Sequence, residues 1–248
     1  MSIVSVSESD FDYHYQLLLK HLRLQGLRPK TIAAYARGIR QVGAYFDYRI
    51  DALTEAQLTE YFHGVLQSRS ASTAKHHLYG LRFYYRHVLH QSLPGVNLVR
   101  TPRARRLPNV VTVDEAQRIF QTTRVLSYRV FYFTLYSLGL RLSEGLGLQL
   151  GDIDAVRARV HIRDAKGGKD RFVPLPATTL DVLRRFWQTH RNPVWIFPSR
   201  QGGASAAGRA TRPLDRGGIQ ATLRKVAAEC GIKKRSPPTA CATATPRI

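Results

Sequence analysis

The stretch LGLRLSEGLGLQLGDID, residues 138–154, places Arg141 and Glu144 in a run composed mainly of leucine and glycine. A charged side chain flanked by leucines is costly to bury unless an opposite charge or a ligand pairs with it. Because Glu144 follows Arg141 by three residues, its carboxylate can hold the guanidinium in place when both lie on one helical turn. The pattern predicts either an arginine anchored to receive an anion, or a structural pair that only fixes helix packing.

The composition indicates a polyanionic partner. The 248 residues include 38 Lys and Arg against 17 Asp and Glu, which gives a formal net charge of +21 and a pI near 10.7. Binding to nucleic acid relieves the self-repulsion of such a chain and releases counterions. A membrane surface is the competing partner, but the sequence has no run of about 18 apolar residues and no apolar signal core. We therefore expect a cytoplasmic, nucleoid-associated protein that does not contact a membrane.

The cysteines indicate neither a disulfide framework nor a metal site. Cys230 and Cys241 are too few for a disulfide framework and do not form a C-x-x-C pair. We therefore expect no metal site.

Helical periodicity runs through the amino-terminal part of the chain. Residues 1–12 are expected to be disordered. Apolar side chains recur every three or four residues over 30–46, and Thr54 with Gln57 matches a capping box that opens another helix. A further helix is expected over residues 72–90. These patterns predict one helical domain over residues 13–92.

Basic side chains, with one tyrosine among them, lie opposite the apolar stripe of one helix and beside that of another. They are Lys30, Arg37 and Arg40 in one helix, and Lys75, Tyr79, Arg82 and Arg86 in another. Such a stripe is often a solvated face, but here the same sign recurs on successive helices, which favours contact with nucleic acid. The following residues, 93–111, lack periodicity and acidic side chains and contain Arg103, Arg105 and Arg106. They predict an extended basic linker that tracks a phosphate backbone.

The carboxy-terminal part is expected to mix helices with a β-hairpin. Thr112 and Glu115 match a capping box. Alternation in residues 156–163 and 171–176 around a glycine-containing turn predicts two antiparallel strands. Residues 202–208, rich in Gly, Ala and Ser, are expected to form a flexible loop. The predicted fold class is mainly α with a small antiparallel β-sheet.

In this order, the motifs resemble those of the tyrosine recombinases, also called the phage integrase family. LGLRLSEGLGLQLGDID and AKGGKDRFVPLP, residues 165–176, resemble the catalytic domain of that family. The preceding helices resemble its SAM-like core-binding domain, and the similarity extends from about residue 13 to about residue 235. Either motif alone is weak evidence, whereas the pair is quite specific. The resemblance implies a core-binding domain over 13–92 and a catalytic domain over 112–248, with an atypical tail at 236–248.

The resemblance implies roles for particular residues. Arg141 corresponds to the arginine that contacts the scissile phosphate, and Glu144 to the acidic residue that follows it. Lys166 corresponds to the hairpin lysine that protonates the leaving 5′ oxygen, with Lys169 as the nearby substitute; alternatively, these are solubilising lysines at a hairpin tip. In the family, a tyrosine attacks double-stranded DNA and forms a 3′-phosphotyrosyl intermediate without metal or nucleotide cofactor. The implied partners are double-stranded DNA and other recombinase protomers.

The family pattern is incomplete in this sequence. It implies a His-x-x-Arg segment and then a nucleophilic tyrosine after residue 235, but residues 236–248 read SPPTACATATPRI and all twelve tyrosines lie at or before Tyr136. We therefore expect a truncated recombinase that binds DNA but does not cleave it alone. One alternative is a non-catalytic regulator or decoy of recombination sites. Another is an unrelated basic protein that binds RNA.

The tail suggests an origin for this departure. One choice of codons for residues 239–248 encodes His-Ser-Leu-Arg-His-Ser-Tyr-Ala-Thr-His in a neighbouring reading frame. This string contains the missing His-x-x-Arg segment. We hypothesise a single-base insertion or deletion near Pro238, which the nucleotide sequence tests directly.

Overall fold

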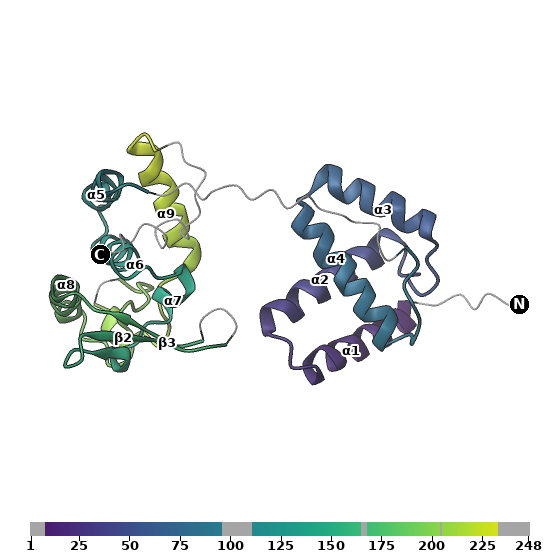
Figure 1. The fold of residues 1–248 in the computed structure, drawn as a ribbon, viewed down its shortest axis with the longest axis horizontal. Helices are drawn as coiled ribbons and strands as arrows, with labels where there is room; N and C mark the ends of the chain where they lie inside the picture. The colour runs from purple at the N-terminus through teal and green to yellow at the C-terminus, as the bar shows by residue number, and fades with distance from the viewer. Residues whose placement is uncertain (1–7, 96–110, 165–167, 204, 233–248) are drawn as a thin grey trace, which may run out of the picture. The chain divides into compact units, whose positions relative to one another are not determined.

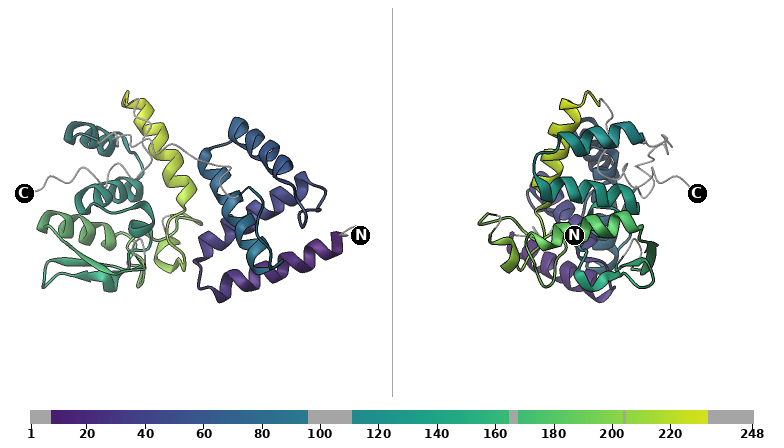
Figure 2. Two further views of the ribbon diagram at one scale, coloured as in Figure 1. Left: turned by 45° about the vertical axis from the view of Figure 1, so that its right-hand side comes forward. Right: turned by 90° about the vertical axis from the view of Figure 1, so that its left-hand side faces the viewer.

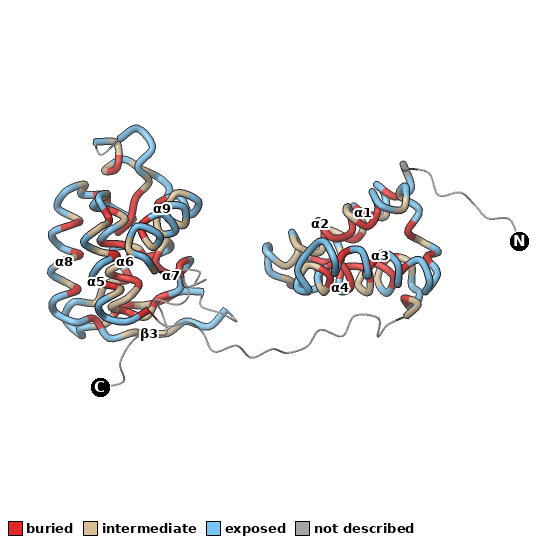
Figure 3. Tube along the Cα trace, turned by 90° about the horizontal axis from the view of Figure 1, so that it is seen from above, coloured by how far each residue is buried: buried red, intermediate tan, exposed pale blue. Residues whose placement is uncertain are grey.

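The computed structural model describes residues 8–95, 111–164, 168–203 and 205–232 (Figure 1). The chain divides into two compact units, Met1–Arg105 and Arg106–Ile248. Each unit has its own hydrophobic core, seen as the red segments in Figure 3. The predicted fold class is confirmed, because helices dominate and a small antiparallel sheet accompanies them.

The described part of the amino-terminal unit consists of four helices. They are α1 (Glu8–Leu24), α2 (Pro29–Tyr45), α3 (Glu55–Ser68) and α4 (Ala71–His87). Glycines bring α2 and α4 together: a Cβ added to Gly38 would lie 3.1 Å from Cδ2 of His77, and one added to Gly80 would lie 3.3 Å from the backbone oxygen of Tyr35. These two positions allow a close helix crossing because they carry no side chain.

Local signals fix where these helices begin. The capping box predicted at Thr54 is confirmed, since the Thr54 N–H donates to Gln57 Oε1 at 2.9 Å and the Gln57 N–H donates to Thr54 Oγ1 at 3.3 Å. The hydroxyl of Tyr85 donates to the Ile50 carbonyl at 2.8 Å and accepts the Leu53 N–H at 3.0 Å. This tyrosine therefore fastens the loop before α3 to α4.

The disorder expected for residues 1–12 is wrong for the described part, because α1 begins at Glu8. Phe11 is 3% exposed, and its ring centroid lies 5.1 Å from that of Tyr48. Phe11, Tyr15, Leu18 and Leu22 recur at helical spacing and are all buried. Burial of this stripe stabilises the first turns of α1. Residues 1–7 lie outside the described residues.

The carboxy-terminal unit surrounds one central helix. Its helices are α5 (Val113–Thr122), α6 (Leu126–Leu138), α7 (Leu142–Leu146), α8 (Ala177–Gln188) and α9 (Arg216–Glu229), with short 3-10 helices η1 (Leu150–Asp152) and η2 (Ala207–Arg209). Both views in Figure 2 place α6 between α5 and α8. Phe131 and Leu135 of α6 are almost completely buried, as a central helix requires. None of the described helices is long and apolar enough to cross a membrane.

The sheet contains one strand more than the predicted hairpin. Strands β1 (Ile153–Asp154), β2 (Arg159–Ile162) and β3 (Arg171–Pro174) pair antiparallel in the order β1-β2-β3. In this register Val160 pairs with both Ile153 and Val173. The first strand was predicted to begin at residue 156, but the chain turns before β2 and Ala158 takes a left-handed φ of 47°. The capping box at Thr112 and Glu115 is confirmed.

Two glycines position α7. Gly139 ends α6 in the left-handed conformation, with φ of 61°. A Cβ added to Gly145 would lie 2.5 Å from Cδ2 of Leu135 and 3.1 Å from Cε2 of Phe131. The absence of a side chain at Gly145 therefore lets α7 lie directly against α6.

Candidate functional site

Arg141 lies at the turn between α6 and α7, as the residue that precedes the first turn of α7. The neighbouring Leu140 and Leu142 are 0% and 5% exposed, whereas the side chain of Arg141 is 46% exposed. The leucines enter the core and the guanidinium reaches the surface. Of these two charged residues the buried one is Glu144, whose side chain is 4% exposed.

The carboxylate of Glu144 accepts four hydrogen bonds. Oε1 accepts from Arg141 Nη1 and from Arg171 Nη1, both at 2.8 Å. Oε2 accepts from the Arg141 backbone N–H at 2.8 Å and from Arg171 Nη2 at 2.9 Å. Four bonds use the full acceptor capacity of a carboxylate. Glu144 is therefore fixed in position, and it fixes both the backbone and the side chain of Arg141.

These bonds keep Glu144 ionised. Burial alone would raise the pKa of Glu144, but the hydrogen bonds from Arg171 and Arg141 outweigh it and lower this pKa to about 2. The same contact with Glu144 raises the pKa of Arg171. Two guanidinium groups facing one carboxylate leave a net positive charge at the turn.

Arg171 is the residue of this cluster that the sequence reasoning missed. It is the first residue of β3, and its side chain is 34% exposed. Alternation along β3 places it on the same half-buried face as Val173, whereas Phe172 and Pro174 are exposed. An arginine on an inward strand face requires an acidic partner, and that signal was present in the motif RFVPLP.

A second ion pair anchors the hairpin that carries Arg171. Arg163, directly after β2, contacts Asp152 of η1 through Nε and Nη2, both at 2.9 Å. Asp152 is buried and also accepts the Gln149 N–H at 2.8 Å. At the base of β3, Asp170 contacts His161 Nε2 at 2.9 Å. The His161–Asp170 contact joins the two arms of the hairpin to each other, while Arg163 and Arg171 tie them to the rest of the unit.

Of the two hairpin lysines, Lys169 is among the described residues. Lys166 lies outside the described residues. Lys169 is exposed and stands two positions before Arg171 in the chain. The cluster that the structure brings together is therefore Arg141, Glu144 and Arg171.

The predicted DNA-binding residues of the helical unit lie on α2 and α4, which pack against each other. The exposed ones are Lys30, Arg37, Arg40, Tyr79 and Arg86, whereas Lys75 and Arg82 are half-buried. The guanidinium carbon of Arg82 lies 5.9 Å from the ring centroid of Tyr79. Its Nε is buried and has no hydrogen-bond partner among the described residues. Arg103, Arg105 and Arg106 of the expected linker lie outside the described residues.

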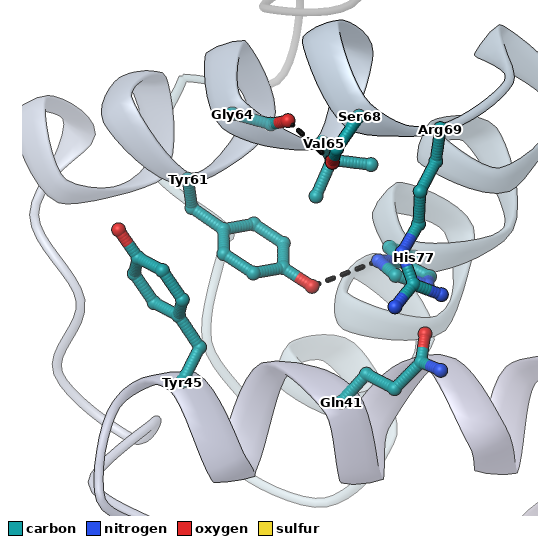
Figure 4. Close-up of a pocket in the computed structure, with 8 residues that line it drawn as sticks. All are labelled: Gln41, Tyr45, Tyr61, Gly64, Val65, Ser68, Arg69 and His77. Carbon is teal, nitrogen blue, oxygen red and sulfur yellow. Dashed lines mark hydrogen bonds between the residues drawn. The ribbon is translucent and has the colours of Figure 1, made fainter.

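A cavity of about 320 Å³ in the amino-terminal unit contains a tyrosine and a histidine (Figure 4). The Tyr61 hydroxyl points toward His77 and lies 2.8 Å from its Nδ1. Burial raises the pKa of Tyr61 to about 12 and lowers the pKa of His77. Both groups are thus neutral and paired with each other near pH 7. We interpret the pair as part of the core.

The residues described by the structure include no group of three or more His, Cys, Asp or Glu side chains that could hold a metal ion.

Fold and site together define a class: a two-unit, mainly helical protein in which a β-hairpin and a buried glutamate hold an exposed arginine. A model of the phage integrase family matches residues 109–240. A model of the phage integrase N-terminal SAM-like domain matches residues 15–94. The chain belongs to the phage integrase family.

Curated relatives agree with this assignment. An integrase/recombinase of Escherichia coli is 33% identical over 180 residues, covering 71% of this chain and 52% of the relative. A tyrosine recombinase XerC of Pelobacter propionicus is 30% identical over 203 residues, covering 75% and 64%. A putative integrase/recombinase y4qK of Sinorhizobium fredii is 26% identical over 191 residues, covering 76% and 62%. The matches span between about half and two thirds of these relatives.

Solved structures share the fold at low sequence identity. A lambda integrase dimer bound to a COC′ core site superposes with a TM-score of 0.74 at 16% identity, covering 94% of this chain and 86% of that one. The Tn1549 transposon integrase in complex with transposon right end DNA gives a TM-score of 0.67 at 13% identity, covering 92% and 84%.

Proposed function

We propose that this chain is the DNA-binding part of a tyrosine recombinase and that Arg141 binds a phosphate of the DNA backbone. The observation that carries the proposal is the geometry of Arg141. Its Nη1 is held by Glu144, while its Nε and Nη2 have no protein acceptor among the described residues. A half-exposed guanidinium with fixed orientation and free donors is suited to a phosphate.

Glu144 and Arg171 act as positioning residues in this proposal. Two hydrogen bonds from Arg141 to Glu144 hold Arg141 before DNA arrives, and two from Arg171 hold Glu144, so little side-chain entropy is lost on binding. Because Arg171 belongs to β3, it also fixes the hairpin relative to α7. From the family resemblance we further propose that Lys166 serves as general acid toward the leaving 5′ oxygen, with Lys169 as its substitute.

The amino-terminal unit supplies further DNA contacts. The exposed basic residues of α2 and α4 would contact phosphates, and the half-buried Arg82 would add its positive charge to the same face. We propose that Arg103, Arg105 and Arg106 follow the backbone as a linker between a core-binding domain over 13–92 and a catalytic domain from 112. The lambda integrase and Tn1549 structures are complexes with DNA, which supports this partner.

Cleavage is not expected from these 248 residues alone. Their twelve tyrosines all lie at or before Tyr136. Tyr132, four residues earlier, is buried and donates to the Ile219 carbonyl at 2.7 Å. We therefore propose that the chain occupies recombination sites without forming a phosphotyrosyl bond. It would do so beside other recombinase protomers, as the lambda integrase tetramer bound to a Holliday junction suggests.

Fluorescence anisotropy of labelled oligonucleotides tests this function. We expect duplex DNA to bind more tightly than single-stranded RNA, with affinity that falls steeply as salt rises. A nicked suicide duplex should yield no covalent adduct on a denaturing gel. Preference for RNA, or affinity insensitive to salt, would contradict the proposal of DNA binding. A covalent adduct would contradict the proposal that the chain does not cleave.

A further inference from the structure

The carboxy-terminal unit contains a cavity of about 190 Å³ that the DNA proposal does not use. It lies at the start of α6, at the other end of that helix from the turn that carries Arg141. Its walls include the apolar residues Leu126, Phe186 and Pro198 and the polar residues Ser127, His190 and Arg200. The volume suits a ligand of about one aromatic ring rather than a drug-sized molecule.

Ser127 provides an unused hydrogen-bonding group in this cavity. The residue is 9% exposed, and its Oγ is buried without a hydrogen-bond partner among the described residues. A buried hydroxyl without a partner destabilises the folded state. Ser127 belongs to the first turn of α6, whose preceding residue, Val125, has no side chain able to cap the helix. The first N–H groups of α6 and their partial positive charge therefore have no side-chain cap.

His190 provides a second polar group in the cavity. The Asn192 N–H donates to His190 Nδ1 at 3.0 Å, so the neutral ring carries its proton on Nε2. That Nε2 is buried and makes no well-aligned hydrogen bond among the described residues, although the ring lies against the Ile196 backbone carbonyl. Burial lowers the pKa of His190, opposed by the nearby Ile196 carbonyl, and favours the neutral ring. Within the cavity, His190 therefore acts as a hydrogen-bond donor.

The surroundings of the cavity are positive and ordered. Arg200 is exposed at its edge, with its guanidinium carbon 5.7 Å from the ring centroid of Tyr128. No carboxylate is among the residues that line it. Residues 202–208 were predicted to form a flexible loop, and this prediction is wrong at the carboxy-terminal end of the segment. Ala207 is 7% exposed, and its carbonyl accepts a hydrogen bond from Asn192 Nδ2 at 2.9 Å. Ala207, held in place by this hydrogen bond, therefore forms part of the cavity wall.

We propose that this cavity binds a small organic carboxylate. The oxygens of the ligand accept hydrogen bonds from Ser127 Oγ, His190 Nε2 and the first N–H groups of α6, and its apolar body packs against Phe186. Arg200 contributes longer-range attraction. An anion at the start of a helix is well matched to the exposed N–H groups there. The proposal does not depend on whether the chain binds DNA.

Titration of the full chain with 4-fluorobenzoate, followed by fluorine NMR, tests the site. The neutral 4-fluorobenzyl alcohol should bind about tenfold more weakly than the carboxylate, because it cannot receive charge-assisted hydrogen bonds. Ser127→Ala should weaken the carboxylate about tenfold, and Arg200→Gln about threefold. Ser72→Ala, which changes an exposed serine of the amino-terminal unit, is the matched control and should bind like the wild type.

Thermal unfolding without ligand gives an independent readout. Ser127→Ala should unfold at the same temperature as the wild type or higher, because it removes a hydroxyl that has no partner. A lower unfolding temperature would show that this hydroxyl is already paired and would overturn the proposal. Equal binding of carboxylate and alcohol, or unchanged binding to Ser127→Ala, would overturn it as well. Displacement of fluorobenzoate by a short duplex would assign the site to DNA phosphate instead.

Discussion

Arg171 binds both oxygens of Glu144, through Nη1 at 2.8 Å and Nη2 at 2.9 Å, and so ties the first residue of β3 to α7. The two residues are 27 positions apart in the sequence. This contact connects the hairpin to the turn that presents Arg141. The geometry of the proposed phosphate site therefore depends on a residue that would not itself contact DNA.

Replacing Arg171 should destabilise the carboxy-terminal unit. Arg171→Leu removes two charge-assisted hydrogen bonds from a buried carboxylate, and we expect the free energy of unfolding to fall by about 2 to 3 kcal/mol. Both tryptophans, Trp187 and Trp195, lie in this unit, so urea unfolding followed by tryptophan fluorescence measures it directly. The control Arg184→Leu removes an exposed arginine 3.8 Å from Asp181 and should cost less than about 0.5 kcal/mol. Equal losses in the two variants would contradict the role of Arg171.

The same cluster predicts how stability depends on pH. The pKa of Glu144 falls from an ordinary 4.5 to about 2 in the folded chain, so its contribution is fully present above about pH 4.5. The contribution is lost as pH falls toward 2, because protonation is then easier in the unfolded chain. Relative to Glu144→Gln, the wild type should lose about 3 kcal/mol over this range. Parallel pH profiles for the two proteins, measured by urea unfolding, would contradict the low pKa.

A methyl group at Gly145 should disturb α7. Gly145→Ala places a Cβ 2.5 Å from Cδ2 of Leu135 and 3.1 Å from Phe131, and we expect a loss of about 1 to 3 kcal/mol despite the better helix propensity of alanine. Adding Leu135→Ala should recover part of this loss, because it removes the contacted methyl group. A double-mutant cycle measured by urea unfolding should show coupling of about 1 kcal/mol. Strict additivity would show that the two side chains do not clash.

The basic face of α4 should contribute to DNA affinity. Arg82→Gln removes one positive charge and the unpartnered Nε. We expect the slope of log Kd against log salt for a duplex to fall by about 0.9. The control Lys20→Gln removes an exposed charge from α1 and should leave the slope unchanged. The same change in both variants would indicate a general charge effect rather than a contact at Arg82.

Local patterns in the sequence predicted local structure well. The capping boxes at Thr54 and Thr112 depend on residues three positions apart, and both are present. The apolar periodicity likewise predicted α2, α3 and α4 with small shifts at their ends. The pairing of Arg141 with Glu144 could also be predicted from the sequence, because the two residues are three positions apart and lie within one turn.

The sequence patterns did not predict features that depend on contacts between residues far apart in the chain. The start of α1 is ordered because Phe11 continues the apolar stripe of that helix and packs near Tyr48, and the second of these contacts joins residues far apart in the sequence. Arg171 was overlooked because its partner lies in another element of the fold. The leucines beside Arg141 suggested a buried arginine, whereas the extended backbone at that residue carries its side chain to the surface.

Arg141 is proposed to bind a phosphate of duplex DNA, and the salt dependence of duplex binding by Arg141→Gln tests this contact. We expect the slope of log Kd against log salt to fall by about 0.9, as for the loss of one phosphate contact. Arg184→Gln, in the same unit, serves as the control and should keep the wild-type slope. If Arg141→Gln binds the duplex with the affinity and salt slope of the wild type, Arg141 is a structural residue and the account of this site is wrong.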